Sequence, residues 1–374
     1  MSNAPKVIDL FSGVGGLSLS AIKAGFNVVG AVEQEQRILD SHAKNFPKTN
    51  HLCEDVSSLT GKKLRESIKL NSSELAGLIG GPPCQGFSTI GKMDIKDKRN
   101  NLFSSFFQLT SELNPAFFLA ENVPGILNPQ YDQILKKAFK IVSSDYQILK
   151  PITVCAKDLG APTSRTRVFF IGIRKDIKGL DNLQLALNLL SSDKKTYVNE
   201  ALIGLPKKVS DDWLDYDSSW RKIYLSTSSQ YLKSLNEFID DVGDYKAIQR
   251  FEKKNEVSGC FGTKHSKEIM KRYKELEPGK QDKISKSQKL NPKGFCPTLR
   301  AGTDSTKGSY QAVRPIHPTE SRVITPREAA RLQGFPDWFQ FHETKWHSFR
   351  QIGNSVCPVA GQKVLAAIKS SIKI

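Results

Sequence analysis

The sequence lacks the long apolar segments of membrane and secreted proteins. Its longest purely apolar runs, such as 116–120, have about five residues, whereas a transmembrane helix needs about 20. The first residues, Met1 to Lys6, contain no apolar core of a secretory signal. We therefore expect a cytoplasmic protein without a membrane partner.

Cysteine pairs with metal-binding spacing are also missing. The six cysteines occur at positions 53, 84, 155, 260, 296 and 357, and no two of them form a C-x-x-C pair. His342 and His347 have no cysteine nearby in the sequence. We expect no metal site, and in a reducing cytoplasm the thiols should be free.

Acidic residues are the scarcer charge. The 374 residues include 55 Lys and Arg but 38 Asp and Glu, which gives a formal net charge of +17. The segment Tyr245–Arg300 alone contains 15 basic and 6 acidic residues. An excess of this size favours a polyanionic partner such as nucleic acid, although solubility alone would also account for it.

Strand and helix patterns alternate in the first half of the chain. Helical spacing predicts a helix at 17–24. Short apolar runs predict strands at 7–11, 27–32, 75–79, 116–120 and 168–173. This alternation indicates an α/β fold with an open, doubly wound, mostly parallel sheet.

The composition changes after about residue 178. The stretch 178–320 is rich in Lys, Ser and Asp and has weak periodicity, and the length alone suggests about two domains. The stretch 358–372 has helical spacing. We expect three parts: a first domain at 1–178, a smaller domain with long loops at 179–347, and a segment at 348–374 that returns to the first domain.

A glycine-rich turn follows the first expected strand. The segment Asp9–Gly16, DLFSGVGG, runs from strand to helix, and its glycines allow a ligand close to the backbone. Ser18 replaces the third glycine of the dinucleotide fingerprint. Glu33, 20 residues after Gly13, suits ribose hydroxyls, and Asp55 is placed to accept from an adenine amino group. Alone the turn fits any strand-to-helix connection, but together these residues predict an adenosine-type cofactor.

Reactive side chains follow three other expected strands. Cys84 lies in the Gly- and Pro-rich segment Gly80–Ser88, and a cysteine held in such a turn suits a nucleophile, although a lone cysteine is usually a core residue. Glu121 follows the run 116–120, where it serves either chemistry or a helix cap. Arg165 and Arg167 have the spacing of one strand face, which fits either a carboxylate or phosphate site or an exposed basic edge.

Two further motifs complete the pattern. Arg322–Pro336 reads RVITPREAARLQGFP, and Gln351–Val356 reads QIGNSV. Together with Asp9–Gly16, Pro-Pro-Cys-Gln at 82–85, Glu-Asn-Val at 121–123 and Arg-Thr-Arg at 165–167, this order resembles the DNA (cytosine-5) methyltransferases of bacterial restriction–modification systems. The resemblance covers the chain except about residues 178–290.

The resemblance implies a Rossmann-like methyltransferase sheet with a smaller target-recognition domain. It implies S-adenosyl-L-methionine as methyl donor and S-adenosyl-L-homocysteine as product. The residues expected at this cofactor are Phe11, Gly13, Gly15, Glu33, Asp55, Val56, Pro83, Leu102, Asn354 and Val356.

The resemblance also assigns the chemistry. Cys84 attacks carbon 6 of a cytosine flipped out of duplex DNA, Glu121 holds the ring at N3, and Arg165 supports the base or the carboxylate. Arg167 is also expected in the catalytic site. DNA contacts are expected at Gln85, Ser88, Lys271, Arg272 and Arg300. Double-stranded DNA is the expected partner of a prokaryotic, monomeric enzyme, and a cognate restriction endonuclease is a candidate functional partner.

One departure and several alternatives remain. The family usually has Gln where this chain has Thr163, so the loop that penetrates the DNA is expected to be positioned differently. An amino-group DNA methyltransferase, a transfer-RNA methyltransferase with the same core, a nicotinamide oxidoreductase and a non-catalytic DNA-binding module are alternatives. Of these, only the transfer-RNA enzyme uses both Cys84 and Glu121. The target sequence and the base that removes the carbon-5 proton are not identified.

Overall fold

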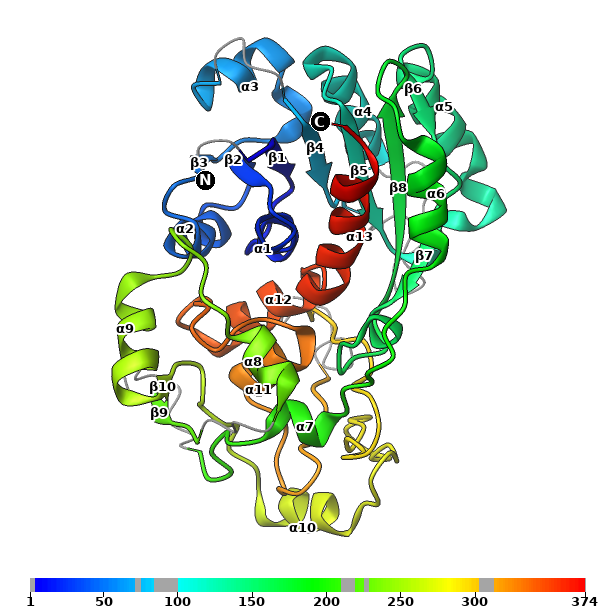
Figure 1. The fold of residues 1–374 in the computed structure, drawn as a ribbon. Coiled ribbons are helices and arrows are strands. Elements are labelled where there is room, and N and C mark those ends of the chain that lie inside the picture. The colour runs from blue at the N-terminus through cyan, green and yellow to red at the C-terminus, as the bar shows by residue number, and fades with distance from the viewer. Residues whose placement is uncertain are drawn as a thin grey trace.

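A central sheet with helices on both faces organises the first half of the protein (Figure 1). This computed structural model describes residues 4–70, 75–83, 100–209, 219–224, 229–302 and 313–373. The strand order is β3-β2-β1-β4-β5-β8-β6, and β7 also pairs with β8. Strands β1 to β5 are parallel, whereas β8 runs antiparallel to β5. The predicted α/β class and mostly parallel sheet are confirmed.

The strands of this sheet are β1 (Lys6–Leu10), β2 (Asn27–Val32), β3 (Asn50–Leu52), β4 (Gly77–Gly80), β5 (Phe117–Asn122), β6 (Tyr146–Ile148), β7 (Ile152–Cys155) and β8 (Thr166–Arg174). The five predicted apolar runs match β1, β2, β4, β5 and β8, whereas the short strands β3, β6 and β7 match none of these runs. The helices of this half are α1 (Gly16–Lys23), α2 (Gln36–Asn45), α3 (Gly61–Ser67), α4 (Asn100–Leu113), α5 (Asp132–Val142) and α6 (Leu180–Asn188). Strand β1 ends one residue before the predicted Phe11, because Phe11 takes a left-handed φ of +56° that leaves the ladder.

Both faces of the sheet are apolar because its strands are buried on both sides. In β5, Phe117 and Leu119 belong to one core cluster, and Phe118 and Ala120 belong to the cluster on the other face. This two-residue alternation explains why β5 appears in the sequence as a continuous apolar run.

The C-terminal helix completes one of these faces. Helix α13 (Pro358–Ser371) packs against α1 and α6 beside the sheet (Figure 1). Its Val364, Leu365 and Ile368 are buried in the cluster that also contains Phe117 of β5. The end of the chain therefore returns to the first half.

The second part of the chain has few regular elements. It contains α7 (Val198–Leu202), α8 (Gln230–Leu235), α9 (Tyr245–Lys254), α10 (Lys267–Glu275), α11 (Pro326–Gln333), α12 (Lys345–Asn354) and a short antiparallel pair, β9 (Arg221–Lys222) and β10 (Glu256–Val257). Its core around Trp338 and Phe339 also includes Val14 and Phe46, so the two parts share apolar contacts.

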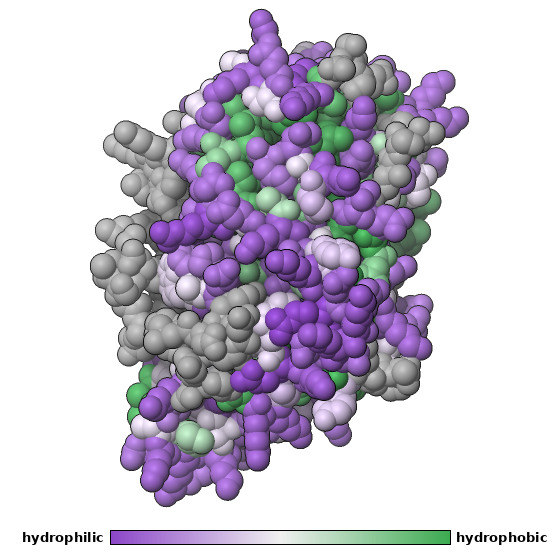
Figure 2. Space-filling model, turned by 90° about the vertical axis from the view of Figure 1, so that its left-hand side faces the viewer, coloured by the Kyte–Doolittle hydropathy of each residue, from purple (hydrophilic) through white to green (hydrophobic). Residues whose placement is uncertain are grey.

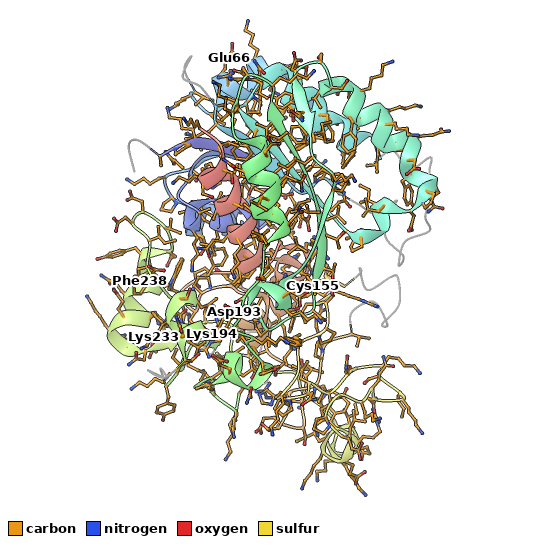
Figure 3. All side chains as sticks on the ribbon, turned by 45° about the vertical axis from the view of Figure 1, so that its right-hand side comes forward. Glu66, Cys155, Asp193, Lys194, Lys233 and Phe238 are labelled. Atoms are coloured by element: carbon orange, nitrogen blue, oxygen red, sulfur yellow. The ribbon has the colours of Figure 1, made fainter. Side chains whose placement is uncertain are left out.

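A hydrogen bond joins α8 to the segment that connects the first half to this second part. Lys194, in the connection after α6, donates to Gln230 at the start of α8, which also carries Lys233 (Figure 3). The face that carries α2 and α9 is mostly hydrophilic (Figure 2). Within the described ranges, no helix combines the length and the apolar character needed to span a bilayer.

Candidate active site

The glycine turn after β1 depends on the absence of side chains. Gly13 and Gly15 have φ angles of +56° and +101°. A Cβ on Gly15 would overlap the ring of Phe46, and a Cβ on Gly16 would lie 2.5 Å from the carbonyl oxygen of Val356. A Cβ on Gly13, in contrast, would meet no described atom within 4 Å. The turn is therefore closely packed at Gly15 and Gly16, whereas the space beside Gly13 is open.

Two carboxylates lie at the same edge of the sheet as this turn. Glu33, directly after β2, accepts from the backbone N–H of Gly13 at 3.1 Å and of Glu35 at 3.0 Å. Burial raises the pKa of Glu33. Asp55, after β3, accepts from the N–H and hydroxyl of Ser57 at 2.9 and 2.8 Å. Glu33 thus also shapes the turn, a role that its spacing from Gly13 does not reveal.

The other predicted cofactor residues come from four elements. Val56 is buried in the turn after Asp55, and Pro83 follows β4. Leu102 is half-buried on α4, which packs against the Val56 turn. Asn354 is exposed at the end of α12, and the chain then passes Gly16 at Val356. The structure therefore brings Val356 to the start of α1 from 340 residues away in the sequence.

Glu121 forms a close ion pair with Arg167. The carboxylate is near the end of β5, and its Oε1 lies 2.6 Å from Nε of Arg167 on β8. A Cβ on Gly81 would lie 3.1 Å from Oε2 of Glu121, and Asn122 donates to the carbonyl of Pro82 at 3.3 Å. The segment that leads to residue 84 therefore passes directly beside Glu121.

Three predicted residues, Cys84, Gln85 and Ser88, lie outside the described residues. The described strand before them, β4, pairs with both β1 and β5. Gly80, the last residue of β4, is opposite Leu10 on one side and Ala120 on the other. The turn after β1, the segment after β4 and Glu121 thus share one edge of the sheet.

Arg165 has a different partner from Arg167. Its buried guanidinium donates to the carbonyl of Leu299 at 3.2 Å. Thr163, also buried, donates to the carbonyl of Cys296 at 3.1 Å, and the backbone N–H of Ser164 donates to the same carbonyl at 2.9 Å. Residues 163–165 therefore hold the second part of the chain. The expectation that Thr163 changes the position of a DNA-penetrating loop stays a prediction.

The predicted DNA-contact residues are spread over the second part. Lys271 is exposed on α10, whereas Arg272 makes a two-pronged ion pair with Asp282 at 2.8 and 3.2 Å. This guanidinium holds the pKa of Asp282 well below its usual range. Arg300 is exposed after Leu299, and α10 lies at the far end of the molecule from β5 (Figure 1).

The motif at 322–336 is a buried ionic framework. Arg322 pairs with Glu328 at 2.7 Å, and Arg331 pairs with Asp337 at 2.7 Å. Arg327 donates to three backbone carbonyls, those of residues 258, 336 and 339. These arginines stabilise the second part internally, and nothing in their sequence pattern distinguishes them from DNA contacts.

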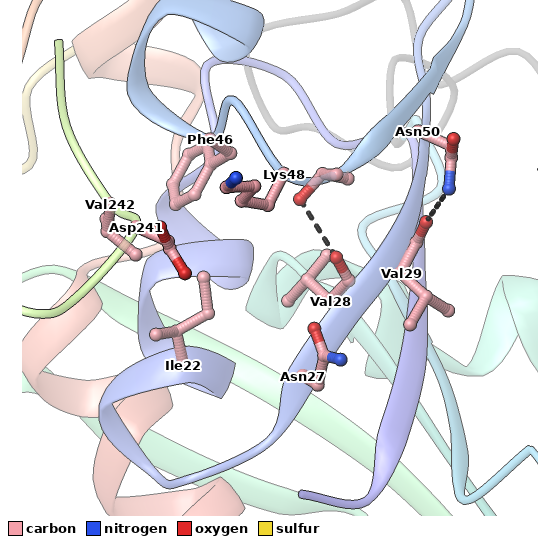
Figure 4. A pocket seen from close by; sticks show the side chains of 10 residues that line it. Ile22, Asn27, Val28, Val29, Phe46, Lys48, Asn50, Asp241 and Val242 are labelled. Atoms are coloured by element: carbon pink, nitrogen blue, oxygen red, sulfur yellow. Dashed lines mark hydrogen bonds between the residues drawn. The ribbon is translucent and has the colours of Figure 1, made fainter. Parts of the chain in front are cut away.

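A pocket of about 380 Å³ lies elsewhere, beside the beginning of β2 (Figure 4). Its lining includes Asn27, Phe46 and Lys48 of the first half and Asp241 of the second. Because β2 begins here and ends at Val32, directly before Glu33, the pocket is at the opposite edge of the sheet from the glycine turn. The described residues include no group of three His, Cys, Asp or Glu side chains arranged for a metal ion.

Comparison with known proteins decides the family. The model of the C-5 cytosine-specific DNA methylases matches residues 5–370. The chain belongs to this family. It is therefore a DNA (cytosine-5) methyltransferase, and the predicted family and enzyme class are confirmed.

Two relatives support this assignment, and a third protein shares the fold alone. The methylase is 37% identical to the Type II methyltransferase M.XorII of Xanthomonas oryzae pv. oryzae over 99% of this chain and 85% of that protein. It is 48% identical to a candidate DNA modification methyltransferase encoded within an E. coli prophage, whose crystal structure superimposes with a TM-score of 0.87 over 98% of this chain and 99% of that one. The S. pombe Dnmt2 methyltransferase, 18% identical, shares the fold with a TM-score of 0.59 over 98% and 97% of the chains.

Proposed function

We propose that this methylase transfers the methyl group of S-adenosylmethionine to carbon 5 of a cytosine flipped out of a specific duplex DNA sequence, as the modification enzyme of a Type II restriction–modification system. The main support is the Glu121–Arg167 pair, which lies beside the segment leading to Cys84 and shares a sheet edge with the glycine turn. The names of the curated relatives support the Type II assignment.

The residues of the turn fit an adenosine-type cofactor. Gly13 leaves open space where another residue would place a Cβ, and the carboxylates of Glu33 and Asp55 follow the next two strands of the same edge. A carboxylate has about four acceptor positions, so Glu33 can bind ribose hydroxyls while it holds Gly13. When bound, S-adenosylmethionine supplies a methyl group on a positively charged sulfur.

The protein's own groups activate the cytosine. Carbon 5 of cytosine is a poor nucleophile, and addition of the Cys84 thiolate at carbon 6 moves electron density onto carbon 5. The Glu121 carboxyl group donates a proton to N3 of the ring, and this proton neutralises the negative charge that develops there as the thiolate adds. Arg167 fixes the Glu121 carboxyl group from the side. After methylation, loss of the carbon-5 proton lets the thiolate leave.

The experiment is a mechanism-based trap. The recognition site is first mapped by sequencing methylated cytosines after expression in a methylation-free host. Duplex DNA with 5-fluorocytosine at that site should then remain attached to the protein when S-adenosylmethionine is present, because fluorine cannot leave as a cation. Peptide mapping should find the adduct on Cys84.

Matched variants give the controls. Cys84→Ser should abolish the adduct, since a hydroxyl is far less ionised than a thiol. Cys260→Ser should leave it intact, because Cys260 lies in the core of the second part and not at the sheet edge that carries Glu121. Glu121→Gln should slow adduct formation without loss of DNA binding. Methylation of ordinary DNA without any cysteine adduct would refute the mechanism, and methylation of transfer RNA in place of duplex DNA would refute the substrate.

A further inference from the structure

A chain of four polar side chains runs beneath the glycine turn. Ser18 on α1 donates to Asp9 on β1 at 2.6 Å and lies 3.0 Å from Nε2 of His42 on α2. Nδ1 of His42 lies 2.9 Å from Nε2 of His51 on β3. Asp9, Ser18 and His42 are buried, whereas His51 is half-buried. The four groups thus connect the interior below the turn to the protein surface.

Asp9 is the inner end of this chain. It is 1% exposed, and its Oδ1 has no hydrogen-bond partner among the described residues. Asp9 lies four residues before Gly13, and the ring of His42 is directly below Gly15, whose Cβ would be 3.1 Å from Cδ2. A charge on Asp9 therefore acts on the cofactor turn through protein, where screening by water is weak.

The hydrogen bonds can run in either direction. With Asp9 ionised, His51 donates to His42, His42 donates to Ser18, and Ser18 donates to Asp9. With Asp9 protonated, every donor and acceptor is exchanged, and both imidazoles again stay neutral. The two arrangements differ by one proton, which enters or leaves at Nδ1 of His51 while each group between gains one proton and loses one.

The surroundings place this exchange near neutral pH. Burial raises the pKa of Asp9 to about 7, the hydrogen bond from Ser18 opposes the rise, and the negative charge of Glu33 adds to it. Burial lowers the pKa of His42 and of His51, so neither imidazole holds an extra proton at pH 7. A hydrogen bond with the backbone of Thr49 favours a proton on His51.

We propose that Asp9, connected to solvent through Ser18, His42 and His51, is a specificity-determining charge that favours the cationic methyl donor over its neutral product. This inference rests on the proposed use of S-adenosylmethionine. The donor carries a positive sulfonium and the product a neutral thioether, and the two molecules are otherwise alike. An ionised Asp9 attracts only the donor, and binding of the donor drives the Asp9 proton out through His51.

The test compares the two ligands by calorimetry on the full-length protein without DNA. Between pH 5.5 and 8.5 the affinity for S-adenosylmethionine relative to S-adenosylhomocysteine should rise about tenfold, which corresponds to a fall of about one unit in the pKa of Asp9 on donor binding. Titrations in buffers with different ionisation enthalpies should show proton release near pH 7 for the donor and less for the product.

Three variants separate the explanations. Asp9→Asn should remove both the pH dependence of the affinity ratio and the difference in proton release. Ser18→Ala should move the transition to higher pH, because the carboxylate loses its hydrogen-bond donor. His265→Gln, a histidine of the second part of the chain, should behave like the wild type.

The outcomes are distinct. Equal proton release and parallel pH curves for the two ligands in the wild-type protein would overturn the role of Asp9 while leaving the cofactor assignment intact. Failure of both ligands to bind at every pH would overturn the cofactor assignment and this inference together. Because the wild-type comparison is sufficient, the test does not depend on whether Asp9→Asn folds.

Discussion

The buried pair Arg331–Asp337 gives a quantitative test of the ionic framework in the second part. Both side chains have no exposed surface, and the guanidinium meets both carboxylate oxygens at 2.7 and 2.8 Å. Arg331 also donates to the carbonyls of Ala201 and Ile203. Arg331→Met keeps much of the side-chain volume but leaves a carboxylate and two carbonyls without this donor.

The expected loss is large. Removal of one partner of a buried pair typically costs about 3–5 kcal/mol, because the remaining charge is buried without compensation. Asn236 still donates to Asp337 at 2.9 Å, so the lower half of this range is expected. A domain is stable by only about 5–15 kcal/mol, so the change should be obvious in an unfolding curve.

Urea unfolding followed by tryptophan fluorescence measures this loss, since Trp338 lies in the same core and donates to the backbone of Asn236. Arg350→Met is the matched control, because the Arg350–Glu35 pair is about one-third exposed and should contribute less than about 1 kcal/mol. The double variant Arg331→Met, Asp337→Leu should regain much of the stability. A loss below about 1 kcal/mol, or a double variant no better than the single one, would refute the reasoning.

Three other predictions follow from the structure. Asp9→Asn should raise the free energy of unfolding by at most about 4 kcal/mol at pH 8 and barely at pH 4. The reason is that the pKa of Asp9 rises from 3.8 to about 7 on folding, so the wild-type protein loses stability as the pH rises through this range. Equal gains in urea unfolding at both pH values would contradict this. Glu33→Gln should weaken S-adenosylmethionine binding about ten- to hundredfold in calorimetry, and normal affinity would remove Glu33 from the site. Alanine at the exposed Lys271, Lys274 and Lys283 should make the log–log salt dependence of DNA affinity shallower by about 0.9 per lost phosphate contact, and an unchanged slope would place the DNA elsewhere.

The strands with long apolar runs, and the polar residues that follow them, could be predicted because both depend on the local sequence pattern. A strand buried on both faces appears as an unbroken apolar run, as in β5, and its polar ending at Glu121 stands out against that run. The glycine turn was recognisable for the same reason, since Gly13 and Gly15 take left-handed angles that few other residues adopt.

The partners of the polar side chains could not be predicted. The spacing of Arg165 and Arg167 suggested a shared role, yet one meets Glu121 and the other meets Leu299, 134 residues away. Likewise, Thr163 departs from the family pattern, but only the fold shows that it holds Cys296. Such pairs depend on how distant segments meet, and no periodicity in the sequence encodes that.

Counting charges overstates the number of side chains available to DNA. Within 245–300, the guanidinium of Arg250 binds Glu256, that of Arg272 binds Asp282, and the buried ammonium of Lys289 donates to the carbonyl of Tyr273. Arg327 and Arg331 also count as basic residues, but both are buried inside the second part. An ion pair adds nothing to the net charge of the protein, whether it is buried or exposed. The positive net charge therefore still attracts a polyanion at long range. The salt slope, in contrast, reports only cations that touch phosphate, so it should be smaller than the 15 basic residues of this segment suggest.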